Sequence, residues 1–129
     1  MNVLDTDLLV AILRGNDEVK PMVDNLNSKE IAITSISAFE LYRGAFASRR
    51  STENAKAVAA MLSAYDILPF DHDAAKITGK LYVTLVAKGV QIEIRDAMIA
   101  GTCLSNNASI VTRNVRHYDR VSGLKVEPW

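Results

Sequence analysis

The sequence predicts an α/β fold with three layers, in which a central parallel sheet of four to five strands is covered by helices on both faces. Two observations support this prediction. Short apolar runs alternate along the chain with longer segments whose apolar residues recur at helical spacing, a pattern typical of parallel sheets. The chain has 129 residues, 49% of them apolar, without repeats, low-complexity tracts or linkers. We therefore expect one domain, 1–129, with one core.

Each expected strand is a short apolar run bounded by turn or capping residues. MNVL runs uninterrupted up to Asp5, and IAITSI is a second, β-branched run. YDILPF is a third run that closes at Pro69, and SIVT is a fourth. The C-terminal LKVEPW is the weakest candidate, which is why the prediction is four to five strands. In chain order, these runs are 1–4, 31–36, 65–70, 109–112 and 124–129.

Between the strands, apolar residues recur every three or four positions, and polar residues suited to helix capping precede them. Asp5 or Thr6 caps the first helix, which Gly15 ends. Asp71 or Asp73 lies near the cap of the long helix that follows the third strand, and that helix ends at a glycine. The later expected helices are 17–26, 37–49, 51–64, 71–89 and 94–107.

Composition narrows the classes of function. Lys plus Arg equals Asp plus Glu at 15 each, so net charge gives no sign of a nucleic-acid binder, and any polyanion contact must come from a local patch. The single Cys103 excludes an internal disulfide and suits a reducing cytosol. We find no apolar run of the roughly 20 residues that a membrane span needs, and no signal-peptide pattern. We therefore expect a cytoplasmic protein with no membrane contact.

Several polar residues lie where the carboxyl ends of the expected parallel strands meet. Ligands of such sheets bind outside those ends, at the point where strand order reverses. Asp5 ends the first strand, and Glu40 lies in the first turn of the helix after the second. Asp96 begins the helix that leads to the fourth strand, which Thr112 and Asn114 follow. Residues far apart in the sequence are thus expected to converge at one edge.

Both Asp96 and Glu40 have structural interpretations as well. Ile99, Ala100 and Cys103 fall on the same helix face as Asp96, which therefore lies on the apolar stripe. The alternative is a first-turn charge that the helix dipole stabilises. SAFE, which ends at Glu40, matches a capping box, in which the Glu side chain reaches back to the cap amide. Both alternatives stay open at this point.

Other polar and aromatic residues are assigned structural roles. Asp7 is interpreted as a helix-start residue, and the DHD stretch at 71–73 as helix capping rather than a metal cluster. His117 is expected on the surface and Cys103 in the core, because neither has partners at ligand spacing. Three aromatic residues at helical spacing are expected in the core rather than in a base-stacking platform: Phe39, Tyr42 and Phe46.

Four stretches in order, VLDTDLLVAIL, SAFELYRGA, LPFDHDAAKITGKL and IRDAMIAGTCLSNNASIVTRNVRHYDRV, resemble a PIN domain. The chain is most similar to the VapC-type ribonuclease toxins of prokaryotic toxin–antitoxin pairs. The resemblance implies a Mg²⁺ or Mn²⁺ site at Asp5, Glu40 and Asp96, supported by hydroxyls at Thr6 and Thr112. Family members often have a fourth acid where this chain has Asn114, a neutral oxygen ligand, and Asp119 is an alternative replacement.

The resemblance implies in-line hydrolysis of an RNA phosphodiester with 5′-phosphate and 3′-hydroxyl products, and it implies a homodimer inhibited by a VapB-type antitoxin. Carboxylates sharing one point repel each other unless a cation neutralises them, which agrees with a metal site. Arg113, Arg116 and Arg120 form a cluster beside Asn114 that either guides RNA phosphates or is an ordinary solvated segment. Arg14, Arg43 and Arg95 would extend that patch if they face it.

Other classes of protein fit less well. A haloacid-dehalogenase-type phosphatase needs a later GD motif, and a receiver domain needs an adjacent acidic pair near its first strand, and we find neither. A PIN-type RNA-processing nuclease without an antitoxin and a non-catalytic PIN-like binding module remain as alternatives.

Overall fold

The computed structural model describes residues 1–26 and 30–129, and its centre is a sheet of five parallel strands. The strand order is β3-β2-β1-β4-β5, so β1 pairs with β2 on one side and with β4 on the other. The strand order reverses at β1, because β2 and β3 lie on one side of it and β4 and β5 on the other. The strands are β1 (Asn2–Leu4), β2 (Ile31–Thr34), β3 (Asp66–Leu68), β4 (Ser109–Thr112) and β5 (Val126–Pro128).

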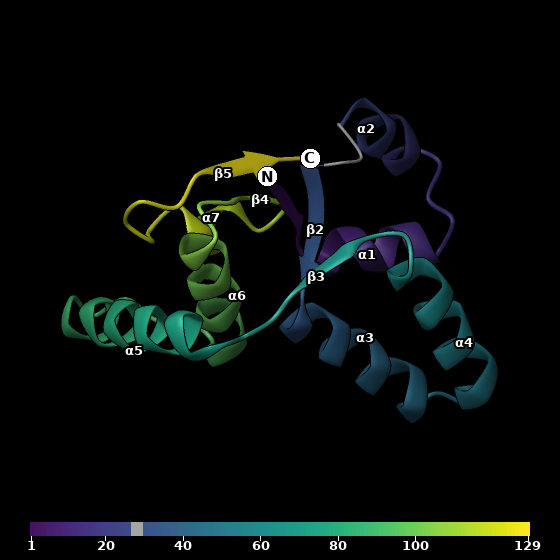
Figure 1. Cartoon of the computed structure of the whole chain (residues 1–129), viewed down its shortest axis with the longest axis horizontal. Helices are drawn as coiled ribbons and strands as arrows, with labels where there is room; N and C mark the ends of the chain where they lie inside the picture. The colour runs from purple at the N-terminus through teal and green to yellow at the C-terminus, as the bar shows by residue number, and fades with distance from the viewer. Residues whose placement is uncertain (27–29) are drawn as a thin grey trace.

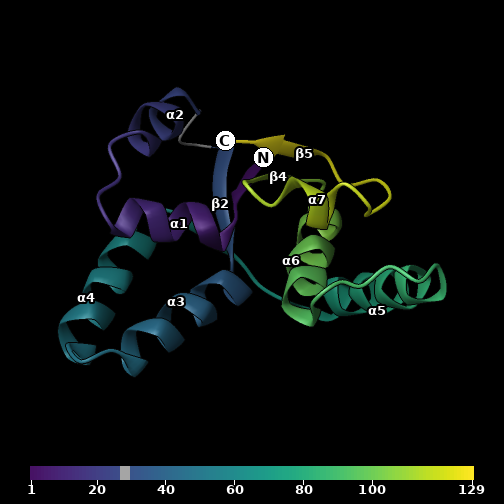
Figure 2. The same cartoon turned by 180° about the vertical axis from the view of Figure 1, so that it is seen from behind.

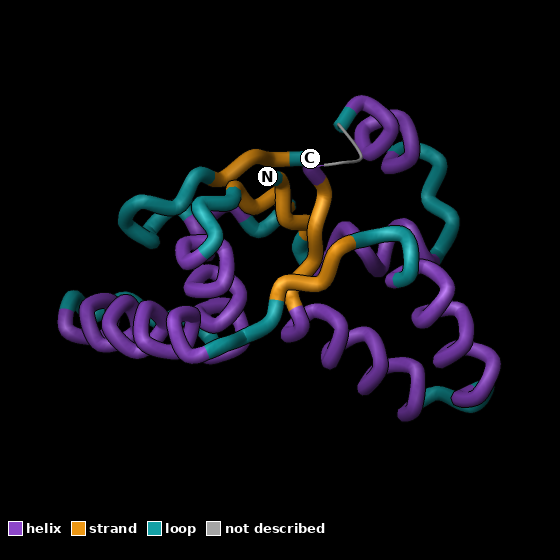
Figure 3. The backbone as a smooth tube through the Cα atoms, viewed as in Figure 1, coloured by secondary structure: helices purple, strands orange, loops and turns teal. Residues whose placement is uncertain are grey.

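Helices cover both faces of this sheet, in two groups (Figures 1 and 2). One layer holds α1 (Thr6–Leu13), α2 (Val19–Asn25), α3 (Ser35–Ala47) and α4 (Ser51–Leu62). The other holds α5 (His72–Ala87), α6 (Ile94–Ser105) and α7 (Val115–Tyr118). Figure 3 shows the strands between the two helical groups. The expected three-layer α/β/α arrangement with a parallel sheet is confirmed.

The pleat of the central strands divides their side chains between two cores. Leu4, Ile33 and Val111 pack into a cluster with α1, α3 and α4, whereas Val3 and Ile110 pack into a cluster with α5 and α6. Successive residues of a strand point to opposite faces, so a sheet covered on both sides reads as a continuous apolar run. This is why the polar residues that end these strands are conspicuous.

The boundary between β2 and α3 differs from the prediction. β2 ends at Thr34 rather than at Ile36, and α3 begins at Ser35 rather than at Ser37. The cause is the Thr34 hydroxyl, which accepts a hydrogen bond from the backbone N–H of Ser37 at 3.1 Å and so serves as the N-cap. Most other elements are one to three residues shorter at an end than expected, and the four-residue α7 was not expected.

Two of the three aromatic residues assigned to the core are on the surface. Phe39 is 55% exposed and Phe46 is 66% exposed, while Tyr42 is half-buried and packs on the core of the α1–α4 layer. α3 leads away from the end of β2 (Figure 1), and neither Phe39 nor Phe46 packs on a core cluster of the described residues, so helical spacing alone does not bury them. Cys103 is fully buried, as predicted, and burial raises the pKa of its thiol to about 12.

Close packing of α5 against α6 sets the position of the latter helix. A methyl group placed on Gly101 would lie 1.9 Å from the Thr78 hydroxyl oxygen and 3.2 Å from the carbonyl oxygen of Ala74. Only a residue without a Cβ fits this crossing. The contact therefore holds α6, which carries Asp96 in its first turn, against α5.

Candidate active site at the carboxyl edge of the sheet

Asp5 is buried at the point where strand order reverses. It follows β1 directly, its side chain is 4% exposed, and its backbone N–H donates to the carbonyl of Val111. Its Oδ1 accepts a hydrogen bond from the Thr6 backbone N–H at 2.9 Å, which caps α1. Its Oδ2 accepts from the Thr112 hydroxyl at 2.7 Å, across the β1–β4 pair. Asp5 is held by hydrogen-bond donors, and no salt bridge among the described residues neutralises it.

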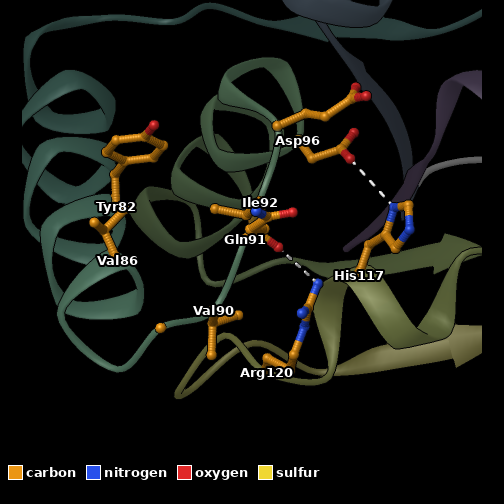
Figure 4. A pocket seen from close by; sticks show the side chains of 10 residues that line it. Tyr82, Val86, Val90, Gln91, Ile92, Asp96, His117 and Arg120 are labelled. Carbon is orange, nitrogen blue, oxygen red and sulfur yellow. Dashed lines mark hydrogen bonds and ion pairs between the residues drawn. The ribbon is translucent and has the colours of Figure 1, made fainter.

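A single tyrosine hydroxyl joins Asp5 to Asp96. The hydroxyl of buried Tyr118 lies 3.2 Å from Asp5 Oδ1 and 3.3 Å from Asp96 Oδ1. Because a phenol carries one proton, it can donate to only one of the two carboxylates at a time. On the outer side, Nδ1 of His117 lies 3.4 Å from Asp96 Oδ2 (Figure 4). Asp96 therefore turns toward the sheet edge from the first turn of α6.

Glu40 is connected to the same edge through Thr6. The Thr6 hydroxyl oxygen lies 3.1 Å from Glu40 Oε1 and 2.9 Å from the hydroxyl oxygen of buried Ser37. Since Thr6 has one proton, it donates to the carboxylate and accepts from Ser37. The other Glu40 oxygen lies 3.9 Å from a guanidinium nitrogen of Arg95. The capping-box alternative is wrong, because the Ser37 N–H is bonded to Thr34 and the Glu40 side chain points elsewhere.

Burial dominates the electrostatics of this edge. It raises the pKa of Asp5 to about 6, although the hydrogen bond from Thr112 opposes the rise and the charge of Asp7 adds to it. Burial also raises the pKa of Asp96, with a further contribution from Glu93 and an opposing one from His117. Both shifts mean that the folded protein favours a proton, or another positive charge, at these carboxylates.

The other predicted polar residues make no described side-chain hydrogen bond to Asp5, Glu40 or Asp96. Asp7 accepts hydrogen bonds from the N–H groups of Leu8 and Arg113, so it starts α1 and fixes the chain after β4. Asn114 supports Thr112 through its backbone N–H, and among the described residues no hydrogen bond of its side chain is found. Asp119 is exposed, with no described contact to the three acids. Asp71 caps α5, as predicted, by accepting from the Ala74 N–H.

The three arginines predicted as one cluster point to different places. The Arg113 guanidinium lies over the Trp129 ring, 3.9 Å from its centroid, which places it toward the C-terminus. Arg120 donates to the backbone carbonyl of Gln91 on the α5–α6 side. Arg116 is exposed and has no salt bridge among the described residues. Neighbouring positions on the short α7 and its flanking turns point in different directions, so proximity in sequence did not predict one patch.

Three contributing residues were missed or misplaced by the sequence interpretation. Tyr118 was not singled out, although Val115, Tyr118 and Val121 recur at a spacing that indicates an inward-facing turn. Ser37 was interpreted as a helix cap but is part of the hydroxyl chain to Glu40. His117 is half-exposed, as a surface residue should be, yet it contacts Asp96. No sequence signal separates such a contact from ordinary exposure.

Two pockets flank the three acids. A pocket of about 640 Å³ borders Asp96 and lies between α5, the 89–93 connection and α7 (Figure 4). A second, of about 510 Å³, borders Thr6 and Glu40 and lies between α1, α3 and α4. Its walls include Val10, Leu41 and Arg43. The acids therefore separate two open recesses, one against each helical layer.

The fold, the strand-order reversal and the three acids at that edge define a class of protein. A PIN domain family model matches residues 3–124, and the chain belongs to this family. Its relatives are VapC proteins, and the similarity extends over nearly the whole chain.

Two relatives and two solved structures illustrate this similarity. The chain is 32% identical to the tRNA(fMet)-specific endonuclease VapC of Salmonella typhimurium, over 98% of this chain and 96% of that protein. It is 31% identical to ribonuclease VapC2 of Rickettsia felis, with the same coverage. DNA-bound VapBC from S. typhimurium superposes with a TM-score of 0.93 at 32% identity, covering 99% of this chain and 97% of that one. VapBC2 from R. felis, bound to a promoter DNA fragment, gives 0.92 at 29% identity, covering 99% and 98%.

Proposed function

We propose that this protein is a metal-dependent endoribonuclease that hydrolyses RNA phosphodiesters and serves as the toxin of a toxin–antitoxin pair. The observation that carries the proposal is Asp5, a carboxylate that is buried where the strand order reverses, has no salt bridge to any residue that the structure describes, and is joined to Asp96 through Tyr118. Membership of a family whose relatives are named ribonucleases supports the same conclusion.

The donor set fits a hydrated Mg²⁺ or Mn²⁺ ion. Among residues 1–26 and 30–129, no three His, Cys, Asp or Glu side chains are close enough to ligate one ion directly. Mg²⁺ keeps several of its waters and needs only one or two carboxylates, so Asp5, Asp96 and Glu40 would hold it partly through water. Such an ion supplies a more acidic water as nucleophile and offsets the charge that develops on the phosphate.

The protein's own residues hold the acids in place for this chemistry. Thr112 and the Thr6 N–H fix the two oxygens of Asp5, and Tyr118 keeps Asp5 and Asp96 on either side of one hydroxyl. The Ser37–Thr6 hydroxyl pair orients Glu40. The hydroxyls of Thr6, Thr112 and Tyr118 each lie within hydrogen-bond distance of an acid and so hold the carboxylates in position.

The substrate and the partners are part of the proposal. One relative is named a tRNA(fMet)-specific endonuclease, so we include tRNA among the substrates to test. The recess between α1, α3 and α4 combines apolar walls with Arg14 and Arg43 and borders Glu40, and we assign it to a segment of a VapB-type antitoxin. The exposed Phe39 and Phe46 of α3 are candidates for the contact of a homodimer in the cytoplasm. Among the described residues, none of the helices has the length and apolarity needed to cross a bilayer.

A ribonuclease assay tests the activity. We expect RNA cleavage with Mg²⁺ or Mn²⁺, none with a chelator, and none in Asp5→Asn or Glu40→Gln protein. Cleavage without toxicity in cells, and without a partner that blocks it, would favour an RNA-processing nuclease. A folded protein that binds RNA but cleaves none with any divalent metal would favour a non-catalytic PIN-like module.

A further inference from the structure

The pocket beside Asp96 borders the acids, but the proposed hydrolysis gives its other lining residues no role. Asp96 itself lines it, so a group bound there lies next to the carboxylates (Figure 4). Its volume of about 640 Å³ is in the range of small-ligand sites. It is open to solvent along one side, so it can admit part of a longer chain.

The walls of this pocket differ in chemistry. Tyr82 and Val86 project from α5 on one side, and Val90 and Ile92 belong to the connection between α5 and α6. On the other side lie the polar ends of His117 and Arg120. One aromatic ring among aliphatic side chains, facing hydrogen-bonding groups, suits a flat heteroaromatic ring with polar edges. An unstacked nucleobase has these properties, because it stacks on an aromatic face and presents its edge to polar groups.

Arg120 connects this pocket to a second, cationic one. Its guanidinium donates to the Gln91 carbonyl at 3.1 Å, which orients it, and no carboxylate of the described residues pairs with it. Arg120 also lines a neighbouring pocket of about 300 Å³, together with Lys80 and Lys88. Within the described part of the chain, no acidic residue lines that neighbouring pocket. Two acids, Glu93 and Asp96, line the first pocket, so positive charge begins at Arg120 and continues along α5 in the second.

We propose that the pocket beside Asp96 holds the unstacked base of a nucleotide adjacent to the scissile phosphate. The strand then continues across Arg120 toward Lys88 and Lys80, whose charges match a phosphate backbone. This inference rests on the proposed ribonuclease function and adds to it a base-binding subsite, in which the base stacks on Tyr82. A duplex would keep the base in its stack, out of reach of Tyr82.

Binding to a short single-stranded RNA tests the base pocket without cleavage. We would measure fluorescence anisotropy in a chelator, in an Asp5→Asn background. Loss of stacking in Tyr82→Ala should weaken binding roughly tenfold, whereas Tyr82→Phe, which keeps the ring, should stay within about twofold. Val83→Ala is the matched control, because Val83 is on the same helix, 68% exposed and not part of the pocket. Val86→Glu, at an exposed position of the pocket, should weaken binding without disturbing the fold.

Abasic substitutions locate the base that the pocket holds. Removing one base at a time from the RNA should identify a position where wild-type affinity falls, and at that position Tyr82→Ala should add no further loss. Removal of other bases should leave the effect of Tyr82→Ala intact. Equal effects at all positions would overturn the base pocket.

Salt dependence tests the path along α5. Arg120→Gln and Lys88→Gln should each reduce the slope of log affinity against log salt by about 0.7, the value for one phosphate contact of a single strand. Lys56→Gln, an exposed lysine on α4 in the opposite helical layer, should leave the slope unchanged. If the protein cleaves RNA but Tyr82→Ala and Val86→Glu bind like Val83→Ala, this inference fails and the proposed function stands. If the protein neither binds nor cleaves RNA, both fail.

Discussion

Replacing Asp5 by asparagine should abolish RNA cleavage and, at the same time, stabilise the metal-free protein at about pH 8. The carboxylate is 4% exposed, and burial raises its pKa from 3.8 to about 6. Because the folded-state pKa is the higher one, the folded protein binds this proton more tightly than the unfolded chain does. Stability from this group is therefore complete below the unfolded pKa of 3.8 and is lost as the pH rises through about 6.

The size of the effect follows from the same shift. A rise of about two pKa units corresponds to roughly 3 kcal/mol of lost folding stability at neutral pH and above. Asparagine removes that cost, but its single carbonyl oxygen cannot accept both from the Thr112 hydroxyl and from the Thr6 N–H, and losing one of these hydrogen bonds costs about 1 kcal/mol. The net expectation is a gain of about 1–2 kcal/mol in the free energy of unfolding. Near pH 5 about half of this cost remains, because the unfolded carboxyl, with a pKa of 3.8, is still ionised there, so the gain should shrink, and below pH 3.8 it should be gone.

Urea denaturation in a chelator at both pH values measures this directly. Asp119→Asn is the matched control, since Asp119 is an exposed carboxylate of the same region and should change stability little. A wild-type free energy of unfolding that stays flat between pH 5 and 8 would refute the argument. So would an Asp5→Asn protein that is less stable than wild type at the higher pH, because Asp5 would then be a structural cap first.

Three further predictions test other parts of the structure. Asp96→Asn should abolish RNA cleavage while the melting temperature stays unchanged or rises, and a variant that unfolds would instead assign Asp96 to helix capping. Gly101→Ala should cost about 1–3 kcal/mol in chemical denaturation because its Cβ overlaps Thr78, whereas Gly79→Ala, which meets no neighbouring atom, should cost nothing. Inhibition by the antitoxin should weaken as Mg²⁺ or Mn²⁺ is raised, if an inhibitor cation competes for the acids. An inhibition constant that does not change with metal concentration would mean that the antitoxin blocks RNA entry at another part of the surface.

The sheet and the positions of Asp5 and Thr112 were predictable because their signals are strong and depend on topology alone. An apolar run that ends in either residue places it at the carboxyl end of a parallel strand, whatever the side-chain details. Asp96 was predictable from its place on the apolar face of its helix. Glu40 was ambiguous, since the capping-box pattern and the site pattern use the same residue. The ambiguity was resolved by Thr34, whose hydroxyl takes the Ser37 amide and leaves Glu40 free to bind Thr6.

The features of the site that the sequence did not predict depend on the directions in which side chains point. Tyr118 becomes part of the site only because the chain after β4 turns back under the two acids. Arg113 and Arg120 are close in sequence but point to Trp129 and to Gln91 respectively. The pocket beside Asp96 combines α5, a connection and α7, and no local pattern describes such a combination.

The bonds that hold Asp5 also determine when, during synthesis, the site is complete. Asp5 is synthesised well before its partners Thr112 and Tyr118, which lie 107 and 113 residues later. At about 5–20 residues per second, a ribosome needs on the order of 5–20 s after Asp5 to add these donors. Contacts between such distant residues also form late in folding, because the intervening loop must close first. A nascent or truncated chain that ends before Tyr118 would carry Asp5 and Asp96 without the hydroxyl that joins them, so activity should arise only after Tyr118 has been added.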